Sequence, residues 1–149
     1  MITPMGTAQK KTVAVIGLGY VGLPLAVRAV ERGYDVIGFD THAEKVEVLK
    51  KKKSPIEDQY LIDNIPKFPF EATTDASRLA DADIVLICVP TPVDEMYYPD
   101  LEPVISAATV SAEHLKKGAL VVLESTVNPG VSEEVIRPIF EEHGHKLGK

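Results

Sequence analysis

The sequence predicts an α/β fold, in which helices cover both faces of a doubly wound parallel sheet. Short apolar runs of strand length alternate along the chain with segments whose apolar residues recur at helical spacing. The first of these runs leads directly into a Gly-x-Gly-x-x-Gly motif, formed by Gly17, Gly19 and Gly22. The 149 residues, 45% of them hydrophobic and 26% charged, provide one domain with enough apolar material for a core.

The first strand is expected at residues 12–16, and the glycine motif turns it into a helix. Gly17 permits the tight turn, Gly19 lets phosphate groups approach the backbone, and Gly22 lets the helix pack closely on the strand. The backbone amides of the first helical turn are then free to hold a pyrophosphate. The motif therefore predicts a dinucleotide site.

The second strand, at residues 35–39, follows a helix that is expected to end at Gly33, and it leads into Asp40. Asp40 lies eighteen positions after Gly22. That spacing is close to the roughly 20 residues typical of the acid that binds the ribose hydroxyls of a dinucleotide. Because a carboxylate there accepts from the 2′-hydroxyl and repels a 2′-phosphate, the sequence favours NAD over NADP.

A helix is expected next, over residues 42–52, and it offers a second interpretation of Asp40. The carboxylate can cap the start of this helix near His42, and the two roles are compatible. Lys45 lies one turn into the helix, where it either reaches the same ribose or is an ordinary exposed lysine.

The alternation of strand and helix continues to the end of the chain. The stretch at residues 54–70 is rich in turns, because its three prolines disfavour long regular structure. Asp100 is expected to cap one later helix that ends at Gly118, and Pro138 is expected to kink the last helix. Three further strands are predicted at residues 70–73, 83–89 and 119–123. The remaining helices and helical turns are predicted at residues 75–80, 100–118 and 131–143. Together these elements predict a Rossmann-type sheet with the strand order 3-2-1-4-5.

Composition limits the function classes. The net charge of −6 argues against nucleic acid as a partner. No apolar stretch approaches the roughly 18 residues that span a bilayer, and the start of the chain lacks the apolar core of a signal peptide, so we expect a cytoplasmic protein with no membrane partner. Residues 1–10 are expected to be a flexible segment, and residues 11–149 the folded domain. The four histidines lack the spacing of a zinc site, and the single cysteine, Cys88, lies in an apolar run typical of a buried, inert thiol.

Ligands of such sheets bind beyond the carboxyl ends of the strands, where the winding direction reverses. Polar segments follow the fourth and fifth predicted strands at that edge. Pro90 and Thr91 belong to a stiff Pro-Thr-Pro segment, which either holds a hydroxyl toward the cofactor or is a rigid loop without contacts. Ser125 and Thr126 lie just before a helix, where they either face the cofactor or simply cap that helix.

Three motifs together carry a family resemblance. They are Gly-Leu-Gly-Tyr-Val-Gly-Leu-Pro-Leu-Ala at 17–26, Val-Pro-Thr-Pro at 89–92 and Glu-Ser-Thr-Val-x-Pro-Gly at 124–130. In this order they resemble the N-terminal NAD-binding domain of the UDP-glucose/GDP-mannose dehydrogenase family, and the resemblance covers the chain from Lys11 to its C-terminus. The third motif looks most like the branch that oxidises UDP-N-acetylhexosamines.

The resemblance implies an activity and a set of roles. Such enzymes oxidise the C6 hydroxyl of a nucleotide sugar to a carboxylate in two hydride transfers, with two NAD⁺ and a thiohemiacetal on a cysteine. It implies that the three motif glycines face the pyrophosphate, that Asp40 and Lys45 contact the ribose, and that Thr91 and Thr126 line the nicotinamide side. Thr126 resembles a threonine that helps to position a water during catalysis. Pro90 and Ser125 are expected to contact the cofactor beside these threonines, and Tyr20 and Val21 to contact it within the glycine motif.

The family's nucleophilic cysteine belongs to segments farther along than this chain extends, and Cys88 does not match it. We therefore expect the cofactor half of a longer enzyme, which binds NAD but does not oxidise the sugar alone. The nucleotide sugar is expected to bind through C-terminal domains, and the parent enzyme to form a homo-oligomer. Without a sixth strand, residues 121–123 are expected to offer an apolar edge to another copy.

Two alternatives remain open at this point. One is the cofactor domain of a β-hydroxyacid or 6-phosphogluconate type dehydrogenase, although those proteins typically have methionine where this chain has Tyr20. The other is a non-catalytic NAD-sensing module.

Overall fold

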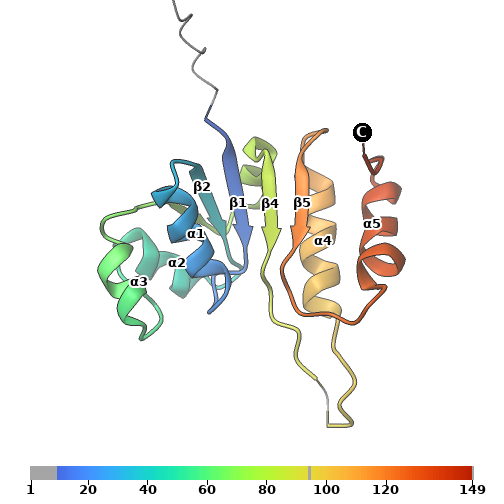
Figure 1. Ribbon diagram of the computed structural model, residues 1–149, viewed down its shortest axis with the longest axis horizontal. Coiled ribbons are helices and arrows are strands. Elements are labelled where there is room, and N and C mark those ends of the chain that lie inside the picture. Colours follow the sequence, from blue (N-terminus) through green and yellow to red (C-terminus); the bar gives the residue numbers. More distant parts are fainter. Residues whose placement is uncertain (1–9, 94, 149) are drawn as a thin grey trace, which may run out of the picture.

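The sheet contains five parallel strands in the order β3-β2-β1-β4-β5 (Figure 1). This computed structural model describes residues 10–93 and 95–148, so most of the expected flexible segment at residues 1–10 lies outside the described residues. The strands are β1 (Thr12–Ile16), β2 (Asp35–Phe39), β3 (Glu71–Thr73), β4 (Ile84–Ile87) and β5 (Leu120–Leu123). The predicted strand order is therefore confirmed.

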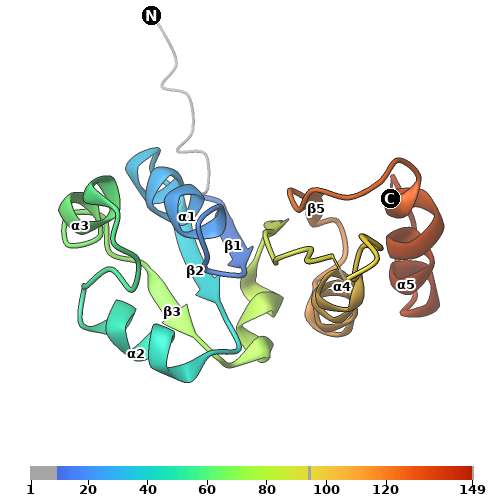
Figure 2. The same cartoon turned by 90° about the horizontal axis from the view of Figure 1, so that it is seen from below.

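The helices are α1 (Gly22–Glu31), α2 (Ala43–Lys50), α3 (Gln59–Asn64), α4 (Glu102–His114) and α5 (Arg137–Glu142), with a 3-10 helix η1 (Ala76–Asp81) and a π-helical turn η2 (Ser132–Ile136). Figure 2 shows α1 and α4 on opposite sides of the sheet. None of these helices has both the length and the apolarity to cross a bilayer, within the residues that the structure describes.

The core forms two apolar layers, one on each face of the sheet. Val13 and Val15 of β1 pack with α1, α2 and α3, whereas Ala14 and Ile16 pack with α4 and η1. This alternation follows from the two-residue period of a strand, and the central strand is buried on both sides because helices cover both faces. The predicted Rossmann-type doubly wound arrangement is thus confirmed.

Local structure differs from the sequence predictions in the turn-rich stretch at residues 54–70. It contains the short helix α3, which fits between Pro55 and Pro66. Its start is stabilised by Asp58, whose side chain accepts a hydrogen bond from the Leu61 amide at 2.9 Å.

Two further helix boundaries differ from the predictions. Helix α4 ends at His114 rather than at Gly118, because Leu115 adopts an extended backbone and its side chain packs into the core. At the other end of α4 the N-cap position is Leu101 rather than the predicted Asp100, and the Asp100 carboxylate, one residue earlier, accepts from the Glu102 amide at 2.9 Å. Near Pro138 the chain forms the π-helical turn η2 followed by α5, because proline has no N–H to donate to the preceding turn.

Candidate functional site

The glycine turn between β1 and α1 lies at the carboxyl edge of the sheet. Gly17 has a φ of +89°, which favours glycine, and an alanine Cβ there would lie 2.9 Å from the Cys88 carbonyl oxygen. At Gly22 a Cβ would lie only 1.9 Å from the Gly17 carbonyl oxygen. These two glycines are therefore required by close contacts within the protein.

Gly19 differs from both of its partners in the motif. A Cβ at Gly19 would meet nothing within 4 Å. The neighbouring side chains of Tyr20 and Val21 are 82% and 53% exposed. No side chain caps the start of α1, and the amides of residues 19–22 donate to no acceptor in the described part of the chain. The turn thus presents open space lined by free N–H groups at a helix N-terminus, which is the arrangement that binds phosphate.

Asp40 follows β2 at the same edge and is only 5% exposed. Its Oδ2 atom accepts hydrogen bonds from the Leu18 amide at 2.9 Å and from the Lys45 Nζ at 2.6 Å. Its Oδ1 atom accepts from the His42 amide at 2.9 Å and lies 2.9 Å from the His42 Nδ1. Asp40 therefore joins the glycine turn to the residue just before α2. The predicted capping of that helix by Asp40 is not observed, because His42 holds the N-cap position without a side-chain cap and the Asp40 carboxylate bonds the His42 amide itself.

Burial of Asp40 opposes its ionisation, but the hydrogen bonds from Lys45, His42 and Leu18 outweigh burial and hold the pKa of Asp40 below its usual value. The site therefore keeps a fixed negative charge beside the glycine turn. The sequence prediction included Asp40 and Lys45 but missed the ring of His42. The available signal was its position two residues after an aspartate, the spacing of an Asx turn.

The segments that follow β4 and β5 are tied together by hydroxyl groups. The Thr91 Oγ1 donates to the Thr126 carbonyl oxygen at 2.9 Å. The Ser125 Oγ donates to the Val89 carbonyl oxygen at 2.8 Å and lies 3.3 Å from that of Ile87. The hydroxyls of Thr91 and Ser125 are therefore engaged by backbone acceptors, whereas Thr126 is exposed beside them, as is Pro90.

Cys88 lies directly beneath the glycine turn. It is 7% exposed, and burial, followed by the negative charge of Glu124, raises the pKa of its thiol to about 12. A thiol that stays protonated is a poor nucleophile, so Cys88 acts as part of the core.

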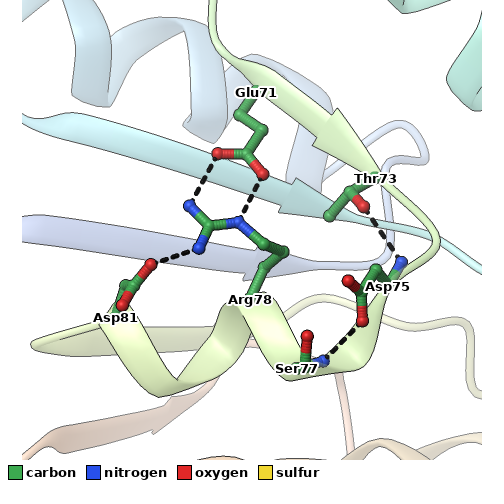
Figure 3. Close-up of polar contacts among 6 residues, drawn as sticks. All are labelled: Glu71, Thr73, Asp75, Ser77, Arg78 and Asp81. Carbon is green, nitrogen blue, oxygen red and sulfur yellow. Dashed lines mark hydrogen bonds and ion pairs between the residues drawn. The ribbon is translucent and has the colours of Figure 1, made fainter.

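The opposite, amino edge of the sheet carries a different polar cluster (Figure 3). Arg78 of η1 donates to both carboxylate oxygens of Glu71, at 2.7 and 3.0 Å, and also contacts Asp81. An open groove of about 580 Å³ runs past Glu71 and Arg78. Nearby, Asp83 pairs with Lys116 at 2.7 Å. Because these groups already pair with one another, we assign them to holding together β3, η1, the start of β4 and the loop that follows α4.

No three His, Cys, Asp or Glu side chains are grouped so as to hold a metal ion, as far as the described ranges extend. The carboxyl edge is therefore defined by the glycine turn, the Asp40 carboxylate and the linked segments after β4 and β5.

Comparison with known proteins adds to this geometry. The sequence matches the UDP-glucose/GDP-mannose dehydrogenase family, NAD binding domain, over residues 11–148. It is 36% identical over 135 residues to protein CapL of Staphylococcus aureus, a match that covers 91% of this chain and 31% of CapL. It is 39% identical over 132 residues to the UDP-N-acetyl-D-glucosamine 6-dehydrogenase of Pseudomonas aeruginosa, covering 87% of this chain and 31% of that enzyme.

A solved structure shows the same arrangement. The UDP-D-ManNAc dehydrogenase from Pyrococcus horikoshii superposes with a TM-score of 0.87 and 31% sequence identity, over 92% of this chain and 34% of that one. The chain thus spans about a third of the length of the curated relatives that it matches.

Proposed function

Because this chain belongs to the UDP-glucose/GDP-mannose dehydrogenase family, as its NAD binding domain, we propose that it is the cofactor-binding part of an NAD-dependent nucleotide-sugar 6-dehydrogenase. Relatives named for UDP-N-acetyl-D-glucosamine and UDP-N-acetyl-D-mannosamine support a UDP-N-acetylhexosamine as the substrate. The proposed reaction oxidises the C6 hydroxyl of that sugar to a carboxylate. The substrate and the oligomeric assembly belong to the whole enzyme.

One observation carries the cofactor assignment. The space that a Cβ of Gly19 would enter is open, and the amides of residues 19–22 beside it donate to no acceptor in the described part of the chain. No contact within the described protein requires glycine at position 19, whereas a pyrophosphate lying against the backbone does. The residues therefore fit a dinucleotide, with Gly17 and Gly22 shaping the turn and Tyr20 and Val21 at its rim.

The remaining roles follow from position along the edge. Asp40 and Lys45, beyond β2, are proposed to bind the adenosine ribose. Thr91 and Thr126, beyond β4 and β5, are proposed to line the nicotinamide, with Pro90 and Ser125 shaping this part of the site. NAD⁺ supplies the hydride acceptor when it is bound. Thr126, whose side chain is exposed at this edge, is proposed to help orient the reacting water.

Calorimetric titration tests this proposal. The wild-type chain is titrated with NAD⁺ and with NADP⁺, and the variant Gly19→Ala is titrated with NAD⁺. We expect saturable NAD⁺ binding and much weaker NADP⁺ binding, because the Asp40 carboxylate repels a 2′-phosphate. Gly19→Ala should weaken NAD⁺ binding at least about tenfold, since its methyl group enters the phosphate space. Its free energy of unfolding should stay within about 0.5 kcal/mol of the wild type, because the methyl meets no protein atom.

Gly33→Ala is the matched control. A Cβ there also meets nothing within 4 Å, but the φ of +92° strains any other residue. This variant should lose stability and keep its NAD⁺ affinity. Failure of the wild type to bind NAD⁺, or equal binding by Gly19→Ala, contradicts the proposal.

A further inference from the structure

Glu124 lies at the carboxyl edge, directly after β5, on the same face of the sheet as α1. The register pairs Ile87 of β4 with Leu123 of β5, and the Glu124 amide extends this pairing by donating to the Ile87 carbonyl oxygen at 2.9 Å. Leu123 packs with the layer under α4, so the alternation of side chains places Glu124 on the opposite face. Cys88, the residue after β4, belongs to that face too.

These positions form a row along one edge. A Cβ at Gly22 would lie 3.1 Å from the Cys88 Cβ, so Cys88 adjoins the start of α1. The charge of Glu124 in turn acts on Cys88, whose thiol pKa it helps to raise after burial. The row therefore runs from the glycine turn through Cys88 to the Glu124 carboxylate.

The Glu124 side chain is exposed, and its carboxylate forms no hydrogen bond or ion pair within the part of the chain that the structure describes. This distinguishes it from Asp40, which holds several donors at once. The negative charge of Glu124 is thus not neutralised by any cation among residues 10–93 and 95–148, and it acts on whatever lies over the ends of β4 and β5.

The orientation of a dinucleotide in this fold identifies what lies there. The two mononucleotide halves of the cofactor lie on the two halves of the sheet, on either side of the reversal between β1 and β4. With its adenosine ribose at Asp40, as proposed above, a bound dinucleotide would have its nicotinamide half over β4 and β5. The oxidised nicotinamide ring carries one positive charge and the reduced ring carries none.

We propose that the Glu124 carboxylate makes this domain bind NAD⁺ in preference to NADH. The inference rests on the proposed cofactor function and deepens it. The two cofactor forms share their phosphates, riboses and adenine, so interactions with these groups cancel in the ratio of NAD⁺ to NADH affinity. A negative charge near the nicotinamide ring does not cancel, because only the oxidised ring is positively charged. Preference for the oxidised form suits a domain that supplies an electron acceptor.

The experiment is calorimetric titration of the wild type, Glu124→Gln and Glu124→Asp with NAD⁺ and with NADH. We expect Glu124→Gln to lower the ratio of NAD⁺ to NADH affinity about threefold to tenfold, the scale of one unit charge acting over several ångströms through a solvent-exposed edge with a dielectric constant close to that of water. Glu124→Asp, which keeps the charge, should keep most of the preference. The effect should shrink at high salt, which screens charges at this edge.

Glu113→Gln is the matched control, since it removes the same charge from an exposed site near the end of α4, at the amino edge. It should leave the ratio unchanged. An unchanged ratio in Glu124→Gln, or an equal shift of both affinities, overturns this inference while binding itself supports the cofactor function. Failure of the wild type to bind either form overturns the proposed function and this inference with it.

Discussion

Gly17, Gly19 and Gly22 belong to one motif but are required for different physical reasons. Gly17 needs its positive φ and its contact with the Cys88 backbone, and Gly22 needs the absence of a Cβ beside the Gly17 carbonyl oxygen. Of the three, only Gly19 has no contact or backbone angle within the described protein that requires glycine. A glycine in such a motif is therefore evidence for a bound ligand only at the position where the fold itself would tolerate alanine.

Gly22→Ala should separate fold from binding at this turn. Its Cβ would lie 1.9 Å from the Gly17 carbonyl oxygen, so α1 must shift away from β1. We expect a loss of about 2–4 kcal/mol in the free energy of unfolding, measured by urea denaturation followed by circular dichroism. Gly19→Ala, three residues earlier, is the control that should keep its stability. If Gly22→Ala unfolds at the same urea concentration as the wild type, the turn can adjust to the added methyl group and the prediction is wrong.

Cys88 should be unreactive in the folded protein. Its thiol is buried, and its pKa is raised to about 12 by burial and by the charge of Glu124, so almost no thiolate exists at pH 8. Iodoacetamide should modify the native chain far more slowly than the chain in urea, as measured by intact mass. Rapid stoichiometric modification of the native chain would contradict the burial of this side chain.

Among the elements, β1, β2 and α2 are joined at the site by the Asp40 carboxylate. Because the pKa of Asp40 is lower in the folded chain than its ordinary value of 3.8, the unfolded chain binds protons more readily at acid pH. The stabilisation from Asp40 is therefore fully present above about pH 4 and is lost as the pH falls through the folded pKa.

Asp40→Asn tests this linkage. At pH 7 the variant should lose about 1–3 kcal/mol of unfolding free energy, because it weakens the ion pair with Lys45 and the hydrogen bonds from the Leu18 and His42 amides. The difference between wild type and variant should shrink below pH 3.8, where the Asp40 carboxylate of the unfolded wild type becomes protonated while that of the folded chain is still ionised. Urea denaturation at pH 7, 4 and 3 measures this difference in unfolding free energy between wild type and Asp40→Asn. Asp63→Asn, at an exposed position of α3, is the control, and a constant difference in unfolding free energy across this pH range would refute the linkage.

Strands β1, β2 and β4 could be predicted from the sequence because each is a short, largely apolar run packed between helices on both faces of the sheet. Helix α3 could not, since its stabilisation depends on the single Asp58 cap between two prolines. The end of α4 was misplaced because Leu115 leaves the helix to enter the core, and burial is a tertiary property. The site residues could be identified by motif, but their partners could not. The bond from Leu18 to Asp40 joins residues 22 positions apart, and the Ser125 hydroxyl reaches back 36 positions to Val89.

Across the whole molecule, β5 is the outermost strand on one side of the described sheet. Its residues are only partly covered, and Leu120 is 57% exposed. An apolar strand with an unpaired edge is a template for pairing with another chain. Self-association at this edge is therefore the expected behaviour of the isolated chain.

Leu120→Lys should suppress this association. A lysine on an edge strand opposes edge-to-edge pairing through its charge, and an exposed position tolerates it without loss of core packing. Sedimentation velocity should show concentration-dependent association for the wild type and a monomer for the variant. Strictly monomeric behaviour of the wild type at high concentration would count against association through β5.

The ion pairs at the amino edge have a practical consequence. Glu71 with Arg78, and Asp83 with Lys116, fasten the elements together on the side of the sheet away from the glycine turn. The carboxyl edge instead holds the free amides and the Asp40 carboxylate. A fluorophore or a surface tether is thus best attached at an exposed position beside the amino edge, such as Glu113. There it stays away from the carboxyl edge, where the cofactor is proposed to bind.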